Sequence, residues 1–114
     1  MGNGERKFLR IAHKIQIKLH VPEGKNYSAE TIDVSDEGMR VITKEKYITI
    51  IPGTEVKVIC TQENLSDFCL LCKSRHYSLK ENGQTVVGFQ IINENEDEEK
   101  KKWLKIIREL QEDN

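Results

Sequence analysis

The sequence predicts an all-β domain of six short antiparallel strands followed by one C-terminal helix. Apolar and polar side chains alternate in several short runs, a pattern that is typical of half-buried strands. Asn82-Gly83 separates two such runs and favours a tight hairpin, because both residue types tolerate positive φ. Near the end of the chain the apolar spacing becomes helical. Six one-sided strands hide their apolar faces by closing into a barrel or by packing as a sandwich.

The first three predicted strands share apolar side chains at every second position. Turn-forming residues at 22–26 separate the first strand from the second. In the second strand, Ile32 and Val34 are expected on one face, because side chains two residues apart point the same way. The three strands are predicted over residues 15–20, 27–34 and 39–43.

The last three predicted strands follow a second break in the chain. Pro52-Gly53 turns the chain before the fourth strand, and Asn82-Gly83 is expected to join the fifth to the sixth in a type I′ turn. These strands are predicted over residues 56–60, 68–79 and 85–92.

The C-terminal segment predicts a helix over about residues 95–112. Asn95 and Glu98 have the spacing of a capping box at its start. Acidic residues precede lysines in the run 96–102, the order that the helix dipole favours, and this run is expected to form a solvated face. The apolar side chains recur at helical spacing and are expected to pack on the strands. They are Trp103, Leu104, Ile107 and Leu110.

The composition is that of a small globular protein with almost balanced charge. The chain has 114 residues, enough for one domain with a modest core. Its 18 Lys and Arg residues nearly balance 19 Asp and Glu residues, which argues against a protein that coats nucleic acid by bulk charge. No apolar run is long enough to insert into a membrane, and the polar N-terminus does not resemble a signal peptide. Three cysteines fit a reducing compartment, so a cytoplasmic location is expected.

Two short motifs indicate a site for a polar, anionic ligand. Arg6 and Arg10 lie four residues apart ahead of the first predicted strand, and Asp33 follows 23 residues after Arg10. Arginine pairs bidentately with phosphate and with the O6/N7 edge of guanine. Asp33, Ser35 and Gly38 place short acceptors and backbone N–H groups in one turn, which suits the amino and imino hydrogens of a purine.

The order of these motifs, RxxxR and then DxSxxG, resembles the PilZ domain family, the bacterial receptors for the second messenger cyclic di-GMP. Two further segments are similar to the family: Pro52-Gly53 before a strand, and Val87-Gly88-Phe89-Gln90 in the last strand. The resemblance implies a flexible arm over residues 1–10. Over residues 11–114 it implies a six-stranded antiparallel β-barrel, the PilZ-like split barrel, with the C-terminal helix.

The resemblance also implies a role for each motif residue. Arg6 and Arg10 would clamp guanine edges and a phosphate of cyclic di-GMP, and Asp33 would accept hydrogen bonds from the other guanine. Ser35 would bond a base or a phosphate, and Gly38 would let the backbone approach closely. Binding would order the arm and change the conformation, which would signal to a protein partner. No catalytic residue, cofactor or metal is expected.

Other functions stay open from the residues themselves. The same fold could act as a ligand-independent protein-interaction module that docks through Trp103 and the helix. A small RNA-binding barrel could use the two arginines and the basic part of strand 68–79. The balanced charge and the few aromatic residues (one Trp, three Tyr and three Phe), mostly in core positions, count against it. An enzyme has the least support, because His13 and His20 lack the spacing of a nucleophilic site.

The cysteines raise the question of a zinc site. Cys69 and Cys72 form a CxxC pair, with His76 four residues beyond and Cys60 upstream. Residues 69 and 72 of one strand point to opposite faces, which disfavours a shared metal. We therefore expect structural thiols buried in the β core, and no metal.

Glu5 bears on how many ligands bind. The PilZ resemblance allows one cyclic di-GMP or a stacked pair for each protomer. A stacked pair concentrates phosphate charge, which Glu5 would repel beside Arg6 and Arg10. One ligand for each protomer is therefore expected.

Overall fold

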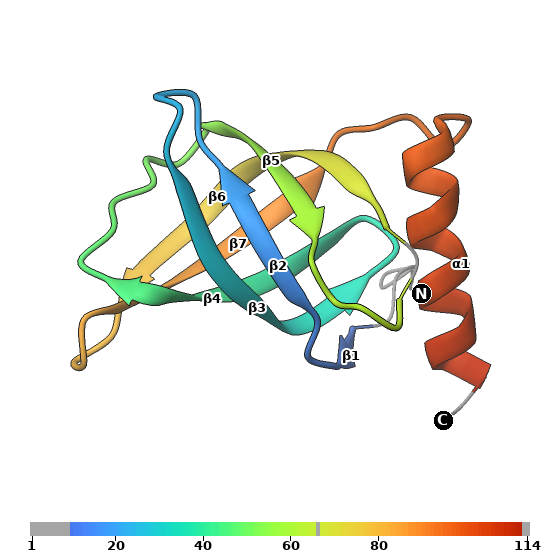
Figure 1. The fold of residues 1–114 in the computed structure, drawn as a ribbon, viewed down its shortest axis with the longest axis horizontal. Coiled ribbons are helices and arrows are strands. Elements are labelled where there is room, and N and C mark those ends of the chain that lie inside the picture. The colour runs from blue at the N-terminus through green and yellow to red at the C-terminus, as the bar shows by residue number, and fades with distance from the viewer. Residues whose placement is uncertain (1–9, 66, 113–114) are drawn as a thin grey trace, which may run out of the picture.

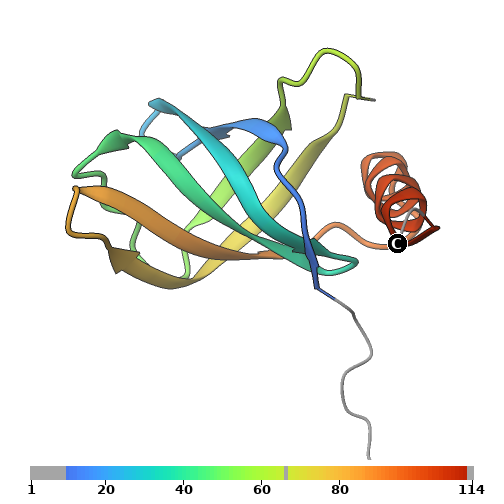
Figure 2. The same ribbon diagram turned by 90° about the horizontal axis from the view of Figure 1, so that it is seen from below.

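The computed structural model describes residues 10–65 and 67–112, which form a β-barrel with a helix beside one end (Figures 1 and 2). Of the predicted arm 1–10, only Arg10 is among the described residues. The strands are β1 (Ile11–Ala12), β2 (Gln16–His20), β3 (Asn26–Ser35), β4 (Gly38–Lys46), β5 (Glu55–Cys60), β6 (Cys69–Leu79) and β7 (Gln84–Ile91), and the helix is α1 (Glu98–Glu112).

Six strands close into the barrel. The order β3-β2-β5-β6-β7-β4 returns to β3 through the β3–β4 pairing, and every pairing is antiparallel. The prediction of a six-stranded antiparallel barrel with a C-terminal helix is therefore confirmed. The two-residue strand β1 is an addition that the sequence pattern did not predict. It pairs with the end of β3, beyond the part of β3 that β2 covers.

The core lies inside the barrel and continues under the helix. Inward positions alternate along much of the strands, as in β2, where Ile17 and Leu19 are almost fully buried. At the helix, Trp103 and Ile107 are both 0% exposed, and the Trp103 ring packs edge-on against Phe68, with 5.1 Å between the ring centroids. The prediction that the apolar stripe of the helix packs on the strands is confirmed.

A β-bulge near the end of β3 changes which side chains point outward. Thr31 pairs with Val41, but Asp33 pairs with Arg40, so β3 has one residue more than β4 between these pairs. Paired residues share a face, and Arg40 is exposed, so Asp33 lies on the outer face. The prediction that Ile32 and Val34 share one face is wrong, because the bulge breaks the alternation between Thr31 and Val34.

The hairpin between β6 and β7 differs from its prediction. Gly83 has a φ of 91°, but Tyr47 is the only residue other than glycine with positive φ in the described part of the chain. Asn82 therefore does not adopt the conformation that a type I′ turn requires. Its side-chain oxygen instead accepts the N–H of Gln84 at 3.0 Å, in a longer loop that ends on the left-handed glycine.

Helix α1 begins later than the capping-box spacing predicts. Asp97 caps it, because Asp97 Oδ1 accepts the N–H groups of Glu99 at 2.8 Å and Lys100 at 3.3 Å. Asn95 does not cap; its side-chain oxygen accepts a bond from Lys100 Nζ at 3.1 Å. The prediction of a solvated charged run is also wrong for Lys100, whose side chain is only 1% exposed.

Candidate functional site

The pairing of β1 with β3 brings the first motif to the second. Ala12 lies opposite Asp33 in the β1–β3 register. Arg10 comes two residues before Ala12, just ahead of β1, and its side chain reaches Asp33. Arg10 Nη1 donates to Asp33 Oδ1 at 2.9 Å. The structure thus brings Arg10 and Asp33, which lie 23 residues apart in sequence, into direct contact. Arg6 lies outside the described residues.

A second arginine binds the same carboxylate. Arg40 Nη2 and Nε donate to Asp33 Oδ2 at 2.8 Å and 3.1 Å. The sequence motifs do not include Arg40, and its role could not be decided from the sequence. The sequence did contain a signal for the position of Arg40. A two-residue hairpin turn at Asp36–Glu37 pairs Ser35 with Gly38, and two residues further along each strand it pairs Asp33 with Arg40.

The carboxylate is covered, and the two guanidinium groups are open to solvent. The Asp33 side chain is 13% exposed, and the Arg10 and Arg40 side chains are 51% and 53% exposed. Two positive groups around one negative group leave one uncompensated positive charge at this place on the barrel. An anionic group is the ligand that such an arrangement attracts.

The turn after β3 holds the other two predicted site residues. Ser35 is almost fully buried, and its Oγ donates to the Gly38 carbonyl at 3.4 Å, a long hydrogen bond. Gly38 pairs with Gln90 of β7 and lies so close to the Phe89 carbonyl oxygen that a Cβ would collide with it. Gly38 therefore has a packing role within the barrel itself.

We expect Gly38→Ala to lower the free energy of unfolding by about 1–3 kcal/mol, because the added methyl group presses on backbone that cannot move alone. Gly88→Ala is the matched control. Its Cβ would find only the His76 side chain, at 3.5 Å, which is ordinary contact. Urea denaturation checks both variants. Equal midpoints for Gly38→Ala and the wild type would contradict the packing role.

Helix α1 binds this turn at two points. Trp103 Nε1 donates to the Ser35 carbonyl at 2.9 Å in a buried hydrogen bond. The buried Lys100 ammonium lies 3.4 Å from both carboxylate oxygens of Glu37, in the middle of the turn. The turn that carries the second motif is therefore fastened to the helix by a neutral hydrogen bond and by an ion pair.

The cysteines fit a structural role in two of three cases. Burial raises the pKa of Cys72 to about 12, and burial also raises the pKa of Cys60, so both are neutral thiols. Cys69 is exposed, so the expectation of buried thiols is wrong for this residue. Cys69 and Cys72 point to opposite faces, as expected. Within residues 10–65 and 67–112, no group of three or more His, Cys, Asp or Glu side chains could hold a metal ion.

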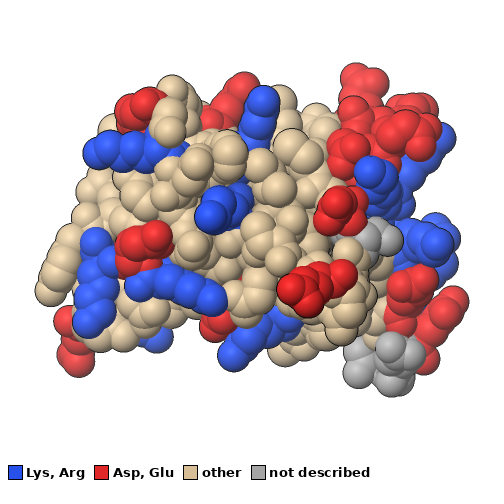
Figure 3. All heavy atoms as spheres, in the orientation of Figure 1, with Lys and Arg blue, Asp and Glu red and all other residues tan. Residues whose placement is uncertain are grey.

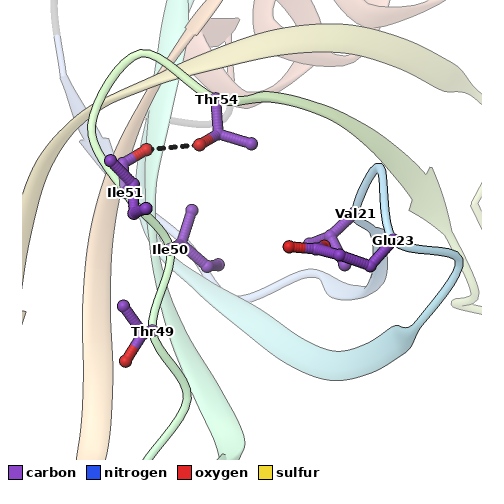
Figure 4. A pocket seen from close by; sticks show the side chains of 6 residues that line it. All are labelled: Val21, Glu23, Thr49, Ile50, Ile51 and Thr54. Carbon is purple, nitrogen blue, oxygen red and sulfur yellow. Dashed lines mark hydrogen bonds between the residues drawn. The ribbon is translucent and has the colours of Figure 1, made fainter.

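A pocket of about 270 Å³ is lined by neither Arg10 nor Arg40, and Figure 4 shows its lining residues. It opens between the turn after β2 and the segment before β5, at the end of the barrel opposite α1 (Figures 1 and 4). Glu23 is the one charged residue among those that line it, which makes the pocket unsuited to a phosphate. The lining residues are Val21, Glu23, Thr49, Ile50, Ile51 and Thr54.

The surface has no broad region of one charge on the face seen in Figure 3, where basic and acidic side chains are interspersed over the barrel and the helix. On this face no bulk charge favours an anion, so local placement of charge, as around Asp33, matters more. In the part of the chain that the structure describes, no helix is long and apolar enough to cross a membrane.

Comparison with known proteins identifies the class to which this barrel and its two motifs belong. The sequence matches the profile of the PilZ domain family over residues 5–109. The match covers most of the chain, and the protein belongs to the PilZ domain family. The domains of this family are receptors rather than enzymes. No curated protein matches the sequence closely enough to count as a relative.

Solved structures of other proteins are similar in fold, and three of them illustrate the likeness. The PilZ domain with c-di-GMP of YcgR from Escherichia coli aligns with a TM-score of 0.77 at 12% identity, covering 96% of this chain and 94% of that one. The PilZ domain of CeSA from a cellulose-synthesizing bacterium gives 0.65 at 16% identity, with coverages of 90% and 98%. The inhibitor of motility MotI/DgrA from Bacillus subtilis gives 0.74 at 11% identity, covering 97% of this chain and 53% of that one.

Proposed function

We propose that this protein is a receptor for cyclic di-GMP that binds it through Arg6, Arg10, Asp33, Ser35 and Gly38. One observation carries the proposal: the ion pair of 2.9 Å between Arg10 and Asp33, which joins the RxxxR motif to the DxSxxG motif. Family membership and the similar fold of the YcgR domain, whose structure contains c-di-GMP, support it.

The hydrogen bonds of Asp33 limit what its carboxylate can do for a ligand. Each carboxylate oxygen has about two acceptor sites. Oδ2 receives two bonds from Arg40, and Oδ1 receives one from Arg10. As far as the described residues are concerned, one acceptor site therefore remains for a guanine N–H while both ion pairs persist. We infer that Asp33 mainly positions the arginines and accepts a single hydrogen bond from the ligand.

The turn can respond to a ligand without large cost. Among the described residues, the Ser35 hydroxyl donates only a long hydrogen bond of 3.4 Å, which it can exchange for a bond to a base or phosphate. A small movement of Ser35 would also change the length of the hydrogen bond that its carbonyl accepts from Trp103. We infer that this connection carries the conformational signal to α1 and so to a protein partner. Trp103 is the single tryptophan of the chain, so its fluorescence during a titration reports on this connection.

We expect the wild type to bind cyclic di-GMP with one ligand for each protomer, and Arg10→Ala to weaken binding roughly 5- to 150-fold. A bidentate contact of arginine with guanine contributes about 1–3 kcal/mol of discrimination. Arg10 is half exposed and immediately precedes β1, so its loss should leave the barrel folded. Isothermal titration calorimetry measures both affinity and stoichiometry.

The controls separate recognition from general anion binding. GTP and cyclic di-AMP test whether the guanine and the cyclic dinucleotide are both needed. A melting curve of Arg10→Ala, compared with that of the wild type, tests whether the fold is intact. Wild-type affinity in Arg10→Ala, or no binding of cyclic di-GMP by the wild type, would refute the proposed site or the proposed function respectively.

A further inference from the structure

The excess positive charge around Asp33 comes from a residue outside both motifs. Arg40 lies directly opposite Asp33 in the β3–β4 register, so the pairing of two core strands fixes its place. Arg10, in contrast, enters from the short strand β1. The two arginines bind different oxygens of one carboxylate, which holds their guanidinium groups side by side.

Most of the donors of Arg40 have no partner in the described part of the chain. A guanidinium group has five N–H donors. The bonds to Asp33 Oδ2 use Nε–H and one hydrogen of Nη2, and no other described residue receives a hydrogen bond from Arg40. Three donors therefore have no partner within residues 10–65 and 67–112, on a side chain that is 53% exposed.

The residue beside Arg40 on the neighbouring strand has no side chain. On β7, Gly88 is the residue paired with Arg40. Gly88 itself does not cover Arg40, and the side chain next to Gly88 on this flank is that of His76, the residue of β6 that pairs with Gly88. The covered carboxylate of Asp33 lies on the other flank of Arg40.

We propose that Arg40 is a third ligand-binding arginine, which binds a phosphate group of cyclic di-GMP directly. This inference rests on the proposed function. The uncompensated positive charge and the three free donors match a phosphate, which accepts several charge-assisted hydrogen bonds at once. Asp33 holds Arg40 in place, so little side-chain freedom is lost on binding.

A purely positioning role for Arg40 makes a different prediction. In that case Arg40 would only hold Asp33, and its effect on affinity would vanish once Asp33 had lost its charge. The experiment therefore compares Arg40→Ala in the wild type with Arg40→Ala in an Asp33→Asn background. Lys44→Ala is the matched control, because Lys44 is an exposed cation on the same strand that donates to Gln16 instead of Asp33.

Calorimetry with cyclic di-GMP should show that Arg40→Ala weakens binding about tenfold or more in both backgrounds, since hydrogen bonds to charged groups contribute that much. Lys44→Ala should bind like the wild type. An effect of Arg40→Ala that disappears in the Asp33→Asn background would overturn direct binding, as would wild-type affinity in Arg40→Ala. If the wild type itself fails to bind, the proposed function falls and this inference falls with it.

Discussion

Trp103→Ala is expected to lower the free energy of unfolding by about 3–5 kcal/mol, the range for removing a large aromatic side chain from a core. The Trp103 side chain is fully buried, and its ring packs on Phe68 with the ring planes at 74°. It also gives the Ser35 carbonyl its buried hydrogen bond at 2.9 Å. Small domains are stable by about 5–15 kcal/mol, so the variant should be close to unfolding.

Trp103→Phe separates the two contributions of this side chain. Phenylalanine keeps an aromatic ring against Phe68 but leaves the Ser35 carbonyl without its donor, at a cost of about 1–3 kcal/mol. Its free energy of unfolding should therefore lie between those of the wild type and Trp103→Ala. Both variants lack the only tryptophan, so circular dichroism must follow the urea denaturation. A wild-type midpoint for Trp103→Ala would show that α1 does not stabilise the barrel.

The barrel could be predicted from the sequence because its cause is local. Alternation in β2, as at Ile17 and Leu19, follows from one buried face and one solvated face. Most strand ends lie within one residue of those predicted, but β4 continues to Lys46, three residues beyond the predicted end of the third strand. Strand β1 could not be found in this way, because two residues are too few to show a period.

The candidate site was only partly predictable, because its geometry depends on contacts between distant segments. The motifs named Arg10 and Asp33, which the structure joins. The bulge between Thr31 and Asp33, which turns the carboxylate outward, has no signal in the residue pattern. The same holds for Lys100, since a lysine in a charged run gives no sign that a turn 63 residues earlier in the chain will bury it.

Glu37→Ala is expected to lower the free energy of unfolding by about 3 kcal/mol. The Lys100 ammonium is 1% exposed, and its polar contacts are Glu37 at 3.4 Å and Asn95 at 3.1 Å. Removing one partner of a buried ion pair costs about 3–5 kcal/mol, because the other charge stays buried and uncompensated. The Glu37 side chain is 38% exposed, so water can replace part of the interaction, and the lower end of that range applies.

Lys100→Met tests whether the buried charge is the cause. Methionine fills a similar space without a charge, and exchange of a buried ion pair for apolar groups is often close to neutral. Lys100→Met alone should therefore cost less than Glu37→Ala. In the Lys100→Met background, Glu37→Ala should have little effect, because no ammonium group needs a partner. Urea denaturation of the four proteins gives the coupling energy between the two positions. An equal cost of Glu37→Ala in both backgrounds would mean that Glu37 stabilises the turn by itself, and that the ion pair does not fasten the ligand turn to α1.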